Sequence, residues 1–180
     1  MTKTTKLGVA ALVFYVPHAS WHVTHGAAWD LLWMCNVAMP ILVIGAFAQN
    51  PRAVVTAFLF LIYGTPMWLL DVLAGGHMVI TSPLVHVGGL TVAYLAVRTL
   101  GWPRYSWVVA SLASAFVLGL SRLLSPSDAN VNMAFRVYEG WEKYFSSHAT
   151  YVSGLWLVAA AVFGFVEWGA MRMHLRTEQP

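Results

Sequence analysis

Charged residues are scarce in this 180-residue chain. Asp, Glu, Lys and Arg make up only 9% of it, whereas roughly a quarter of a soluble domain is charged. Hydrophobic residues make up 59%, so the composition excludes an ordinary soluble domain and predicts an integral membrane protein. The chain has a single cysteine, Cys35, which excludes an internal disulfide and leaves the redox compartment undetermined.

Several functional signatures are also missing. The sequence contains no GxG repeat and no glycine-rich phosphate loop, and both the HExxH zinc motif and the CxxCH haem attachment motif are absent. The net charge is +3, but no basic patch with interleaved aromatic residues is present, so we expect no nucleic-acid partner. No internal repeat or linker divides the chain, and residues 1–180 are predicted to form a single domain.

Long apolar segments are what the chain has instead. Windows of about 20 residues, the length that crosses roughly 30 Å of hydrocarbon, predict six membrane helices. They cover residues 7–24, 29–48, 53–73, 82–99, 106–124 and 149–171. A secretory signal peptide is the alternative for the first segment, but Pro17 and the histidines after it replace the small-residue cleavage site. The predicted fold is therefore all-α, a polytopic membrane bundle of about six transmembrane helices.

The basic residues of the short connections predict the orientation of this bundle. Six crossings put both termini on one side, and that side holds seven of the ten Lys and Arg residues. They are Lys3, Lys6, Arg52, Arg98, Arg104, Arg172 and Arg176, against Arg122, Arg136 and Lys143 on the other side. Positive charge favours the cytoplasmic side. We therefore expect a multi-pass protein of the cell membrane with both termini cytoplasmic.

The connection between the fifth and sixth segments is the longest, and residues 133–145 within it have an amphipathic pattern. Ala134, Val137, Tyr138, Trp141 and Phe145 share one helical face, and Arg136, Glu139 and Lys143 lie on another. This pattern predicts an interfacial helix before the last span. A mobile lid over an outer site is the alternative.

Six of the seven histidines fall toward the predicted outer side. His18, His22 and His25 are spaced i, i+4 and i+7 on one face of the first helix, while His77, His86 and His148 lie at outer ends of later segments. Each one alone is explained by an interfacial imidazole bonded to carbonyls or water. Ionisable groups at membrane depth are costly and usually face a partner inside the bundle, so together they predict a polar pocket.

Two chemistries suit such a pocket. Imidazoles with a nearby carboxylate, Asp30 or Asp71, could bind a transition metal such as zinc, copper or iron. The candidate ligands are His18, His22, His25 and His148. Haem ligation is disfavoured because the histidines do not pair at two depths.

The second chemistry is nucleophilic. Cys35 and His86 have comparable predicted depths, about 10 Å below the outer boundary for Cys35, so the imidazole could take the thiol proton while Asp71 orients the ring. Inert packing is the alternative for a lone membrane cysteine.

A family resemblance rests on five short motifs between residues 29 and 135. They are Trp33-Met34-Cys35-Asn36, Trp68-Leu69-Leu70-Asp71, Leu84-Val85-His86, Gly101-Trp102-Pro103-Arg104 and Asn130-Val131-Asn132. Together they resemble a family of small uncharacterised bacterial six-helix integral membrane proteins. That family is distantly similar to YwaF-type membrane proteins, whose animal relatives include a phospholipid acyltransferase with a nucleophilic cysteine and the androgen-induced hydrolases of fatty-acid esters.

The resemblance implies roles for five residues. Cys35 would be the acyl-accepting nucleophile and His86 the general base, with Asp71, Asn130 and Asn132 as orienting or oxyanion groups. The expected function is a lipid acyl-transfer or ester-hydrolase site, with membrane lipids as partners. One alternative is a metal-binding, pigment-binding or structural subunit that joins other membrane subunits. A transporter is another, for which Glu167 is the main intramembrane carboxylate, although Glu167 could equally pair with Arg172.

Overall fold

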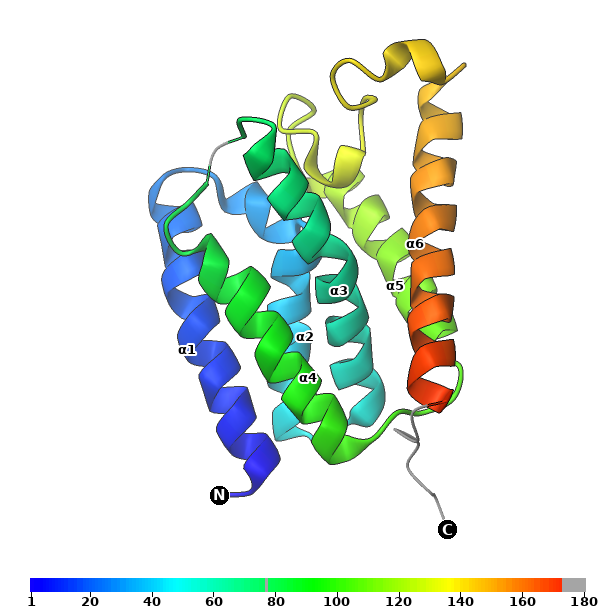
Figure 1. Cartoon of the computed structure of the whole chain (residues 1–180). Coiled ribbons are helices and arrows are strands. Elements are labelled where there is room, and N and C mark those ends of the chain that lie inside the picture. The colour runs from blue at the N-terminus through cyan, green and yellow to red at the C-terminus, as the bar shows by residue number, and fades with distance from the viewer. Residues whose placement is uncertain (77, 173–180) are drawn as a thin grey trace.

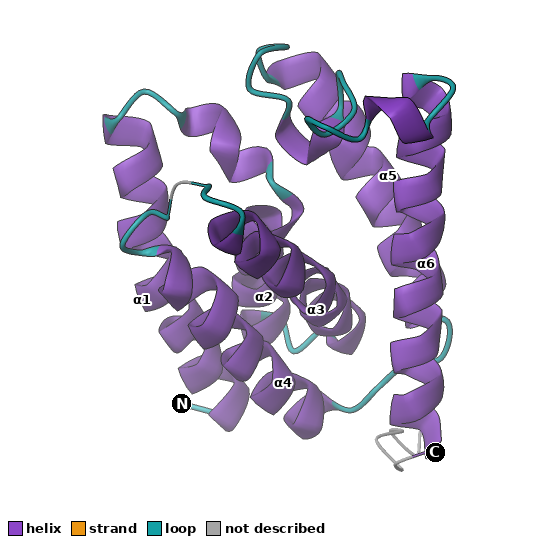
Figure 2. Cartoon of the chain, turned by 45° about the horizontal axis from the view of Figure 1, so that its top comes forward, coloured by secondary structure: helices purple, strands orange, loops and turns teal. Residues whose placement is uncertain are grey.

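The computed structural model describes residues 1–76 and 78–172, and these residues form α-helices and short 3₁₀ and π segments with no strand among them (Figure 2). The helices are α1 (Lys3–Thr24), α2 (Met34–Phe47), α3 (Pro51–Leu73), α4 (Gly89–Leu100), α5 (Ser106–Leu124) and α6 (His148–Arg172). They run alternately up and down, so that the start of α1 and the end of α6 lie at the same end of the bundle (Figure 1). The predicted all-α bundle is thereby confirmed. We call the end where α1, α3 and α5 terminate the far end.

Two of the predicted segments begin with irregular turns. The second starts as the 3₁₀ segment η1 (Ala28–Leu32), which Trp33 separates from α2. The fourth starts as the π-helical segment η2 (Leu84–Gly88), which continues directly into α4. Both irregular segments lie at the far end, beside the last turns of α1.

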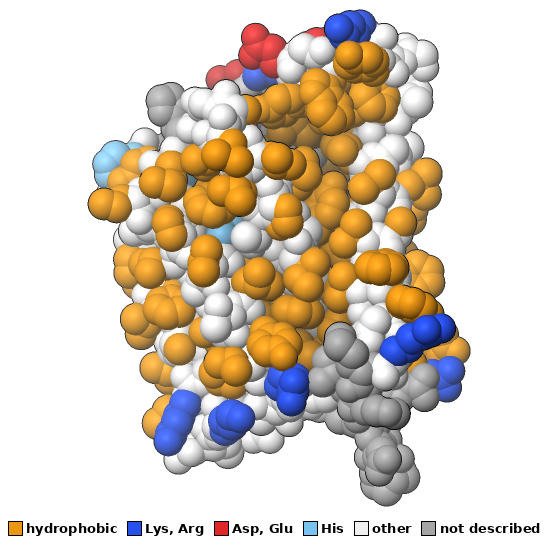
Figure 3. Space-filling view, in the orientation of Figure 1, with side chains coloured by type: hydrophobic (Ala, Val, Ile, Leu, Met, Phe, Trp, Pro, Cys, Tyr) orange, Lys and Arg blue, Asp and Glu red, His pale blue; other side chains and the backbone are white. Residues whose placement is uncertain are grey.

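Among the described residues, the helices α3, α5 and α6 are long and apolar enough to cross a membrane. The α2 helix and the segment Leu84–Leu100 are apolar but shorter. The α1 helix is more polar, since it contains two lysines and two histidines and is followed directly by His25. Apolar side chains cover the middle of the surface in Figure 3, with Lys and Arg at the end where the chain starts and Asp and Glu together with further Lys and Arg at the far end. This distribution suits a lipid-facing belt between two polar ends.

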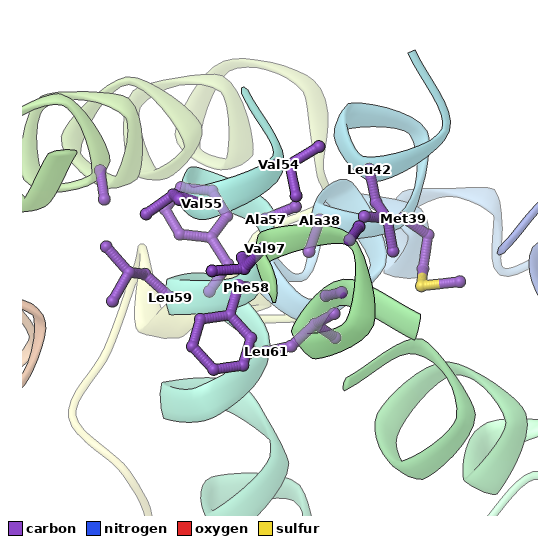
Figure 4. Close-up of a cluster of buried hydrophobic side chains, with 14 of the residues drawn as sticks. Ala38, Met39, Leu42, Val54, Val55, Ala57, Phe58, Leu59, Leu61 and Val97 are labelled. Atoms are coloured by element: carbon purple, nitrogen blue, oxygen red, sulfur yellow. The ribbon is translucent and has the colours of Figure 1, made fainter. Parts of the chain in front are cut away.

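The centre of the bundle is the first half of α3. Every residue from Val54 to Leu61 is buried, because α2, α4 and α5 pack around this part of the helix. Figure 4 shows apolar side chains of this stretch, among them Val54, Phe58 and Leu61, with Ala38, Met39 and Leu42 of α2 and Val97 of α4 in the same cluster. A helix that is apolar on all sides is typical of such a central position.

Glycines let three helices meet at the junction of η2 and α4. A Cβ at Gly88 would come within 2.8 Å of the Phe14 ring of α1, and a Cβ at Gly89 would overlap the Met39 sulfur of α2. Small residues permit close helix contact where lipid provides no hydrophobic force between helices. This contact fixes η2 against α1 and α2, and with it the position of His86.

The predicted interfacial helix is wrong. Residues 133–145 contain no α-helix, and the outer loop between α5 and α6 has only the 3₁₀ turns η3 (Val131–Met133) and η4 (Glu142–Tyr144). Left-handed backbone at Asn130, Asn132, Met133 and Gly140 interrupts any regular helix. The Asn130 side chain also accepts hydrogen bonds from the backbone N–H groups of Phe135 and Arg136, a local alternative to helical bonds that the apolar pattern does not reveal.

Candidate functional site: a buried imidazole cluster

His18 and His22, one turn apart on α1, lie buried side by side near the far end. Their side chains are 2% and 6% exposed, and their rings meet edge to face with centroids 4.6 Å apart. The Nδ1 atom of His18 is 2.9 Å from the Thr81 hydroxyl, just before η2. The i, i+4 spacing thus brings two of the predicted imidazoles together. With His86, which lies close to them, they form a group that we call the imidazole cluster.

His86 joins the cluster from η2 and is 3% exposed. His22 and His86 are both close enough to act electrostatically on His18. The His86 ring stacks on the Trp68 indole of α3 with centroids 4.3 Å apart and planes 10° apart. Thr65, also on α3, donates its hydroxyl to the His86 backbone carbonyl. Single π turns occur frequently at functional sites, and here the turn is held by α3.

Hydrogen bonding fixes which nitrogen of His86 carries the hydrogen. Its Nδ1 atom is 2.9 Å from the Ser82 backbone carbonyl, and because a carbonyl only accepts, Nδ1 must donate. In a neutral ring Nε2 then has a free lone pair. This Nε2 atom is buried and has no hydrogen-bond partner among the described residues. Burial without a facing anion favours the neutral ring, so His86 presents a basic nitrogen inside the bundle.

Asn36 supplies a second acceptor. It is buried on α2, and its Nδ2 donates to the Asp30 backbone carbonyl at 2.8 Å, which orients the amide. The Oδ1 atom is buried and makes no hydrogen bond of ordinary geometry, but the side chain is close enough to the His18 ring to act on it as a hydrogen-bonding group. Sequence reasoning missed Asn36 as part of the cluster, because its position there depends on how α1 and α2 pack together.

Asp30 connects the cluster with the surface. Its Oδ2 atom is 3.4 Å from Nδ1 of His22, and its side chain is 29% exposed. His25 stays outside the cluster, where it is exposed and stacks on Trp21. His148 is also outside the cluster. It is the first residue of α6, and its Nε2 atom is 2.9 Å from the backbone carbonyl of Met133 in the outer loop.

Two of the four candidate metal ligands, His18 and His22, therefore come together and two do not. Within residues 1–76 and 78–172, no group of three His, Cys, Asp or Glu side chains is arranged to hold a metal ion. His77, which the sequence also placed on the outer side, lies outside the described residues. The arrangement that is present offers an imidazole nitrogen and an amide oxygen as hydrogen-bond acceptors.

Cys35 and His86 contact neighbouring turns of α3. Cys35 is half-buried. It packs against Gly64 of α3, because a Cβ built on Gly64 would come within 3.0 Å of the Cβ of Cys35. Gly64 and Trp68, the residue under His86, are four residues apart on one face of α3, about 6 Å along the axis. Among the described residues, no hydrogen bond joins the Cys35 thiol to the His86 imidazole. The two groups pack on successive turns of α3 without a direct bond between them.

Asp71 faces the outer loop. It is exposed and accepts a hydrogen bond from the Tyr138 hydroxyl at 3.1 Å, which raises the pKa of Tyr138 above its ordinary value. Asp71 was expected to orient the His86 ring, but the Ser82 backbone carbonyl makes that contact instead. The partner of Asp71 could not be read from the sequence because it depends on the path of the loop.

Asn132 uses all its side-chain hydrogen-bonding groups to hold η1 and α2 against α5. Its Nδ2 donates to the Leu32 carbonyl at 2.7 Å and to the Ser121 hydroxyl at 2.8 Å. Its Oδ1 accepts from the Met34 N–H at 3.0 Å. With these bonds in place, Asn132 positions the junction that carries Asp30, Cys35 and Asn36.

Replacing Asn132 with Ala is expected to lower the free energy of unfolding by about 2 kcal/mol, because three hydrogen bonds worth roughly 1 kcal/mol each are lost and solvent replaces them only in part. Asn132→Asp keeps the acceptor, loses both donors and directs a carboxylate oxygen toward the Leu32 carbonyl, so its loss of stability should be at least as large. Chemical denaturation in detergent micelles measures both variants. Equal stability of Asn132→Ala and the parent protein would contradict this structural role.

Glu167 has a partner set that the sequence did not predict. On α6 it is buried and accepts hydrogen bonds from the backbone N–H groups of Tyr105 and Trp107, both at 2.8 Å, and from the Trp102 indole at 3.3 Å. It therefore caps the N-terminus of α5 from another helix. Arg172 lies over the Trp168 ring instead, 4.2 Å from its centroid.

The candidate site is thus a buried group of imidazole and amide acceptors at the far end, ringed by α1, η1, α2, η2 and the last turns of α3. Its chemistry is that of a proton acceptor in a largely apolar setting. Comparisons with models of protein families, with curated proteins and with solved structures found no match for this chain.

Proposed function

We propose that the protein is a six-pass membrane protein that catalyses acyl transfer or ester hydrolysis on membrane lipids, with His86 as the general base. The observation that carries the proposal is the buried Nε2 atom of His86, whose lone pair is free because Nδ1 donates to the Ser82 carbonyl. A general base needs a lone pair, a fixed ring and a partly desolvated position. Stacking on Trp68 and the Ser82 contact supply the fixed ring.

The arrangement follows the logic of nucleophile, base and orienting group. In that scheme the Ser82 carbonyl holds the imidazole in the required tautomer, a task that a carboxylate performs in other sites. Cys35 is the proposed acyl carrier, since it contacts α3 one turn from His86. A thiol in apolar surroundings ionises with difficulty, so a neighbouring base is what such a nucleophile requires.

The proposed reaction begins when His86 takes the thiol proton. The Cys35 sulfur then attacks the ester carbonyl carbon, a C–S bond forms, and the C–O bond breaks. The leaving alcohol receives the proton back from His86. The acyl group next passes from Cys35 to an acceptor, which restores the thiol.

The proposed orientation places the far end, with the imidazole cluster, at the outer leaflet and both termini in the cytoplasm. Among the described residues, three helices of spanning length support membrane insertion. Figure 3 shows Lys and Arg side chains at both ends, and the excess of seven against three on the side of the termini supports a cytoplasmic N-terminus. Lipid esters would reach the cluster from within the bilayer.

Cys35→Ala tests the acyl carrier. We expect the parent protein in phosphatidylcholine nanodiscs to acquire a hydroxylamine-sensitive label from a fluorescent long-chain activated ester, and Cys35→Ala to acquire none, because only a thiol forms a thioester. The substitution removes one sulfur atom and leaves the contact with Gly64 intact. His25→Gln, at an exposed imidazole, is the matched control and should label normally. Unchanged labelling of Cys35→Ala would exclude Cys35 as the acyl carrier.

A further inference from the structure

Among the described residues, three buried side-chain atoms at the cluster make no hydrogen bond: His86 Nε2, Asn36 Oδ1 and His22 Nδ1. His22 Nδ1 faces the Asp30 carboxylate at 3.4 Å, whereas the other two have the same hydrogen-bonding character. His86 Nε2 is an acceptor because Nδ1 carries the ring hydrogen, and Asn36 Oδ1 is an acceptor because Nδ2 is turned toward the Asp30 carbonyl. Both residues flank His18. In each case the assignment follows from a carbonyl partner, which can only accept.

A group that enters the cluster must therefore bring a donor. Leaving a buried acceptor unpaired is unfavourable. An ester carbonyl, an ether or a phosphate oxygen would place a second acceptor opposite His86 Nε2 and leave both without a donor. An ammonium group would bring donors but also a positive charge among three imidazoles, with Asp30 already facing His22. A hydroxyl group brings one donor and no charge.

We propose that the imidazole cluster binds the acyl acceptor of the reaction, and that this acceptor is a hydroxyl group whose O–H donates to His86 Nε2. The inference rests on the proposed function and specifies its second substrate. The hydroxyl belongs to water, which gives a hydrolase, or to a lipid alcohol, which gives an acyltransferase.

The step balances with the residues already named. His86 Nε2 takes the hydroxyl proton as the oxygen attacks the thioester carbonyl carbon. A C–O bond forms and the C–S bond to Cys35 breaks. The leaving thiolate then receives the proton from His86, so the imidazole is again neutral and the thiol is restored.

The test compares dodecanol with dodecyl methyl ether, which has the same chain and an acceptor oxygen but no donor. The probe is the ¹⁵N signal of His86 Nε2 in ¹⁵N-histidine-labelled protein in phosphatidylcholine nanodiscs, assigned through the His86 backbone. We expect dodecanol to shift this signal in a saturable manner and the ether to leave it unchanged. Equal responses to both compounds, or no response to either, would overturn the inference.

Product analysis identifies the source of the hydroxyl. With a long-chain activated ester and dodecanol present, fatty acid as the product indicates water and dodecyl ester indicates a lipid alcohol, and both products support a hydroxyl acceptor. The Nε2 shift does not require turnover. A dodecanol-specific shift without any acyl product would therefore contradict only the proposed function, whereas acyl products with equal responses to alcohol and ether would contradict only this inference.

Discussion

Replacing His86 with Gln is expected to reduce the turnover of a long-chain ester by about 10²- to 10⁴-fold, the usual contribution of a general base. Glutamine is polar and of similar length, and its amide can still donate to the Ser82 carbonyl. It has no nitrogen that can take a proton near neutral pH, so the proton transfer from nucleophile to base is lost. The rate of fluorescence release from a fluorogenic long-chain ester in nanodiscs measures the effect.

His25→Gln is the matched control for this prediction. His25 is exposed and stacks on Trp21, which also contacts the His22 ring. Because His25 itself is outside the cluster, its replacement should change the rate by less than about twofold. Thermal unfolding of His86→Gln separates lost catalysis from lost structure, because the stacking on Trp68 also contributes to stability. A folded His86→Gln protein that retains the parent rate would refute the assignment of His86 as the base.

Glu167→Ala is expected to lower the free energy of unfolding by about 3 kcal/mol or more. The change leaves the backbone N–H groups of Tyr105 and Trp107 and the Trp102 indole without their acceptor. The Trp102 bond is buried and the other two are part-buried, and an unsatisfied buried donor costs roughly 1–3 kcal/mol. The carboxylate also lies at a helix N-terminus, where negative charge is favourable. Urea or guanidinium unfolding in micelles, followed by tryptophan fluorescence, measures the difference.

Two further variants sharpen this prediction. Glu167→Gln keeps one acceptor oxygen but directs an NH₂ group toward a backbone donor, so its loss of stability should lie between those of Ala and the parent. Glu139→Ala removes an exposed carboxylate from the outer loop and should change stability by no more than about 0.5 kcal/mol. Equal losses of stability in Glu167→Ala and Glu139→Ala would contradict the role of Glu167 as the cap that stabilises α5.

Apolar segment lengths predicted the helices of this fold well. The segments expected at 53–73 and 106–124 correspond to α3 and α5 almost residue for residue, because a long apolar run has few alternatives to a helix. The irregular starts at η1 and η2 were not predictable, since they depend on Trp33, Gly88 and Gly89 and on contacts with other helices. The outer loop was mispredicted because amphipathic spacing says nothing about left-handed turns.

The candidate site was predictable only where spacing along one helix determines contact. The i, i+4 rule placed His18 beside His22. The partners of His86, Asp71 and Glu167 are determined by tertiary packing, and Ser82, Trp68, Tyr138 and Trp102 could not be assigned from one sequence. The same limit applies to Asn36, whose role emerges only when α1 and α2 are side by side.

The imidazole cluster is built entirely from residues 18–86, and α5 begins only at Ser106. Its polar side chains are therefore all synthesised before the second half of the protein leaves the ribosome. Chains fold from the N-terminus during synthesis, so α1 to α4 can shelter these groups from lipid during insertion. On this view the last two helices arrive at a site already assembled, and Asn132 then locks the η1–α2 junction to α5.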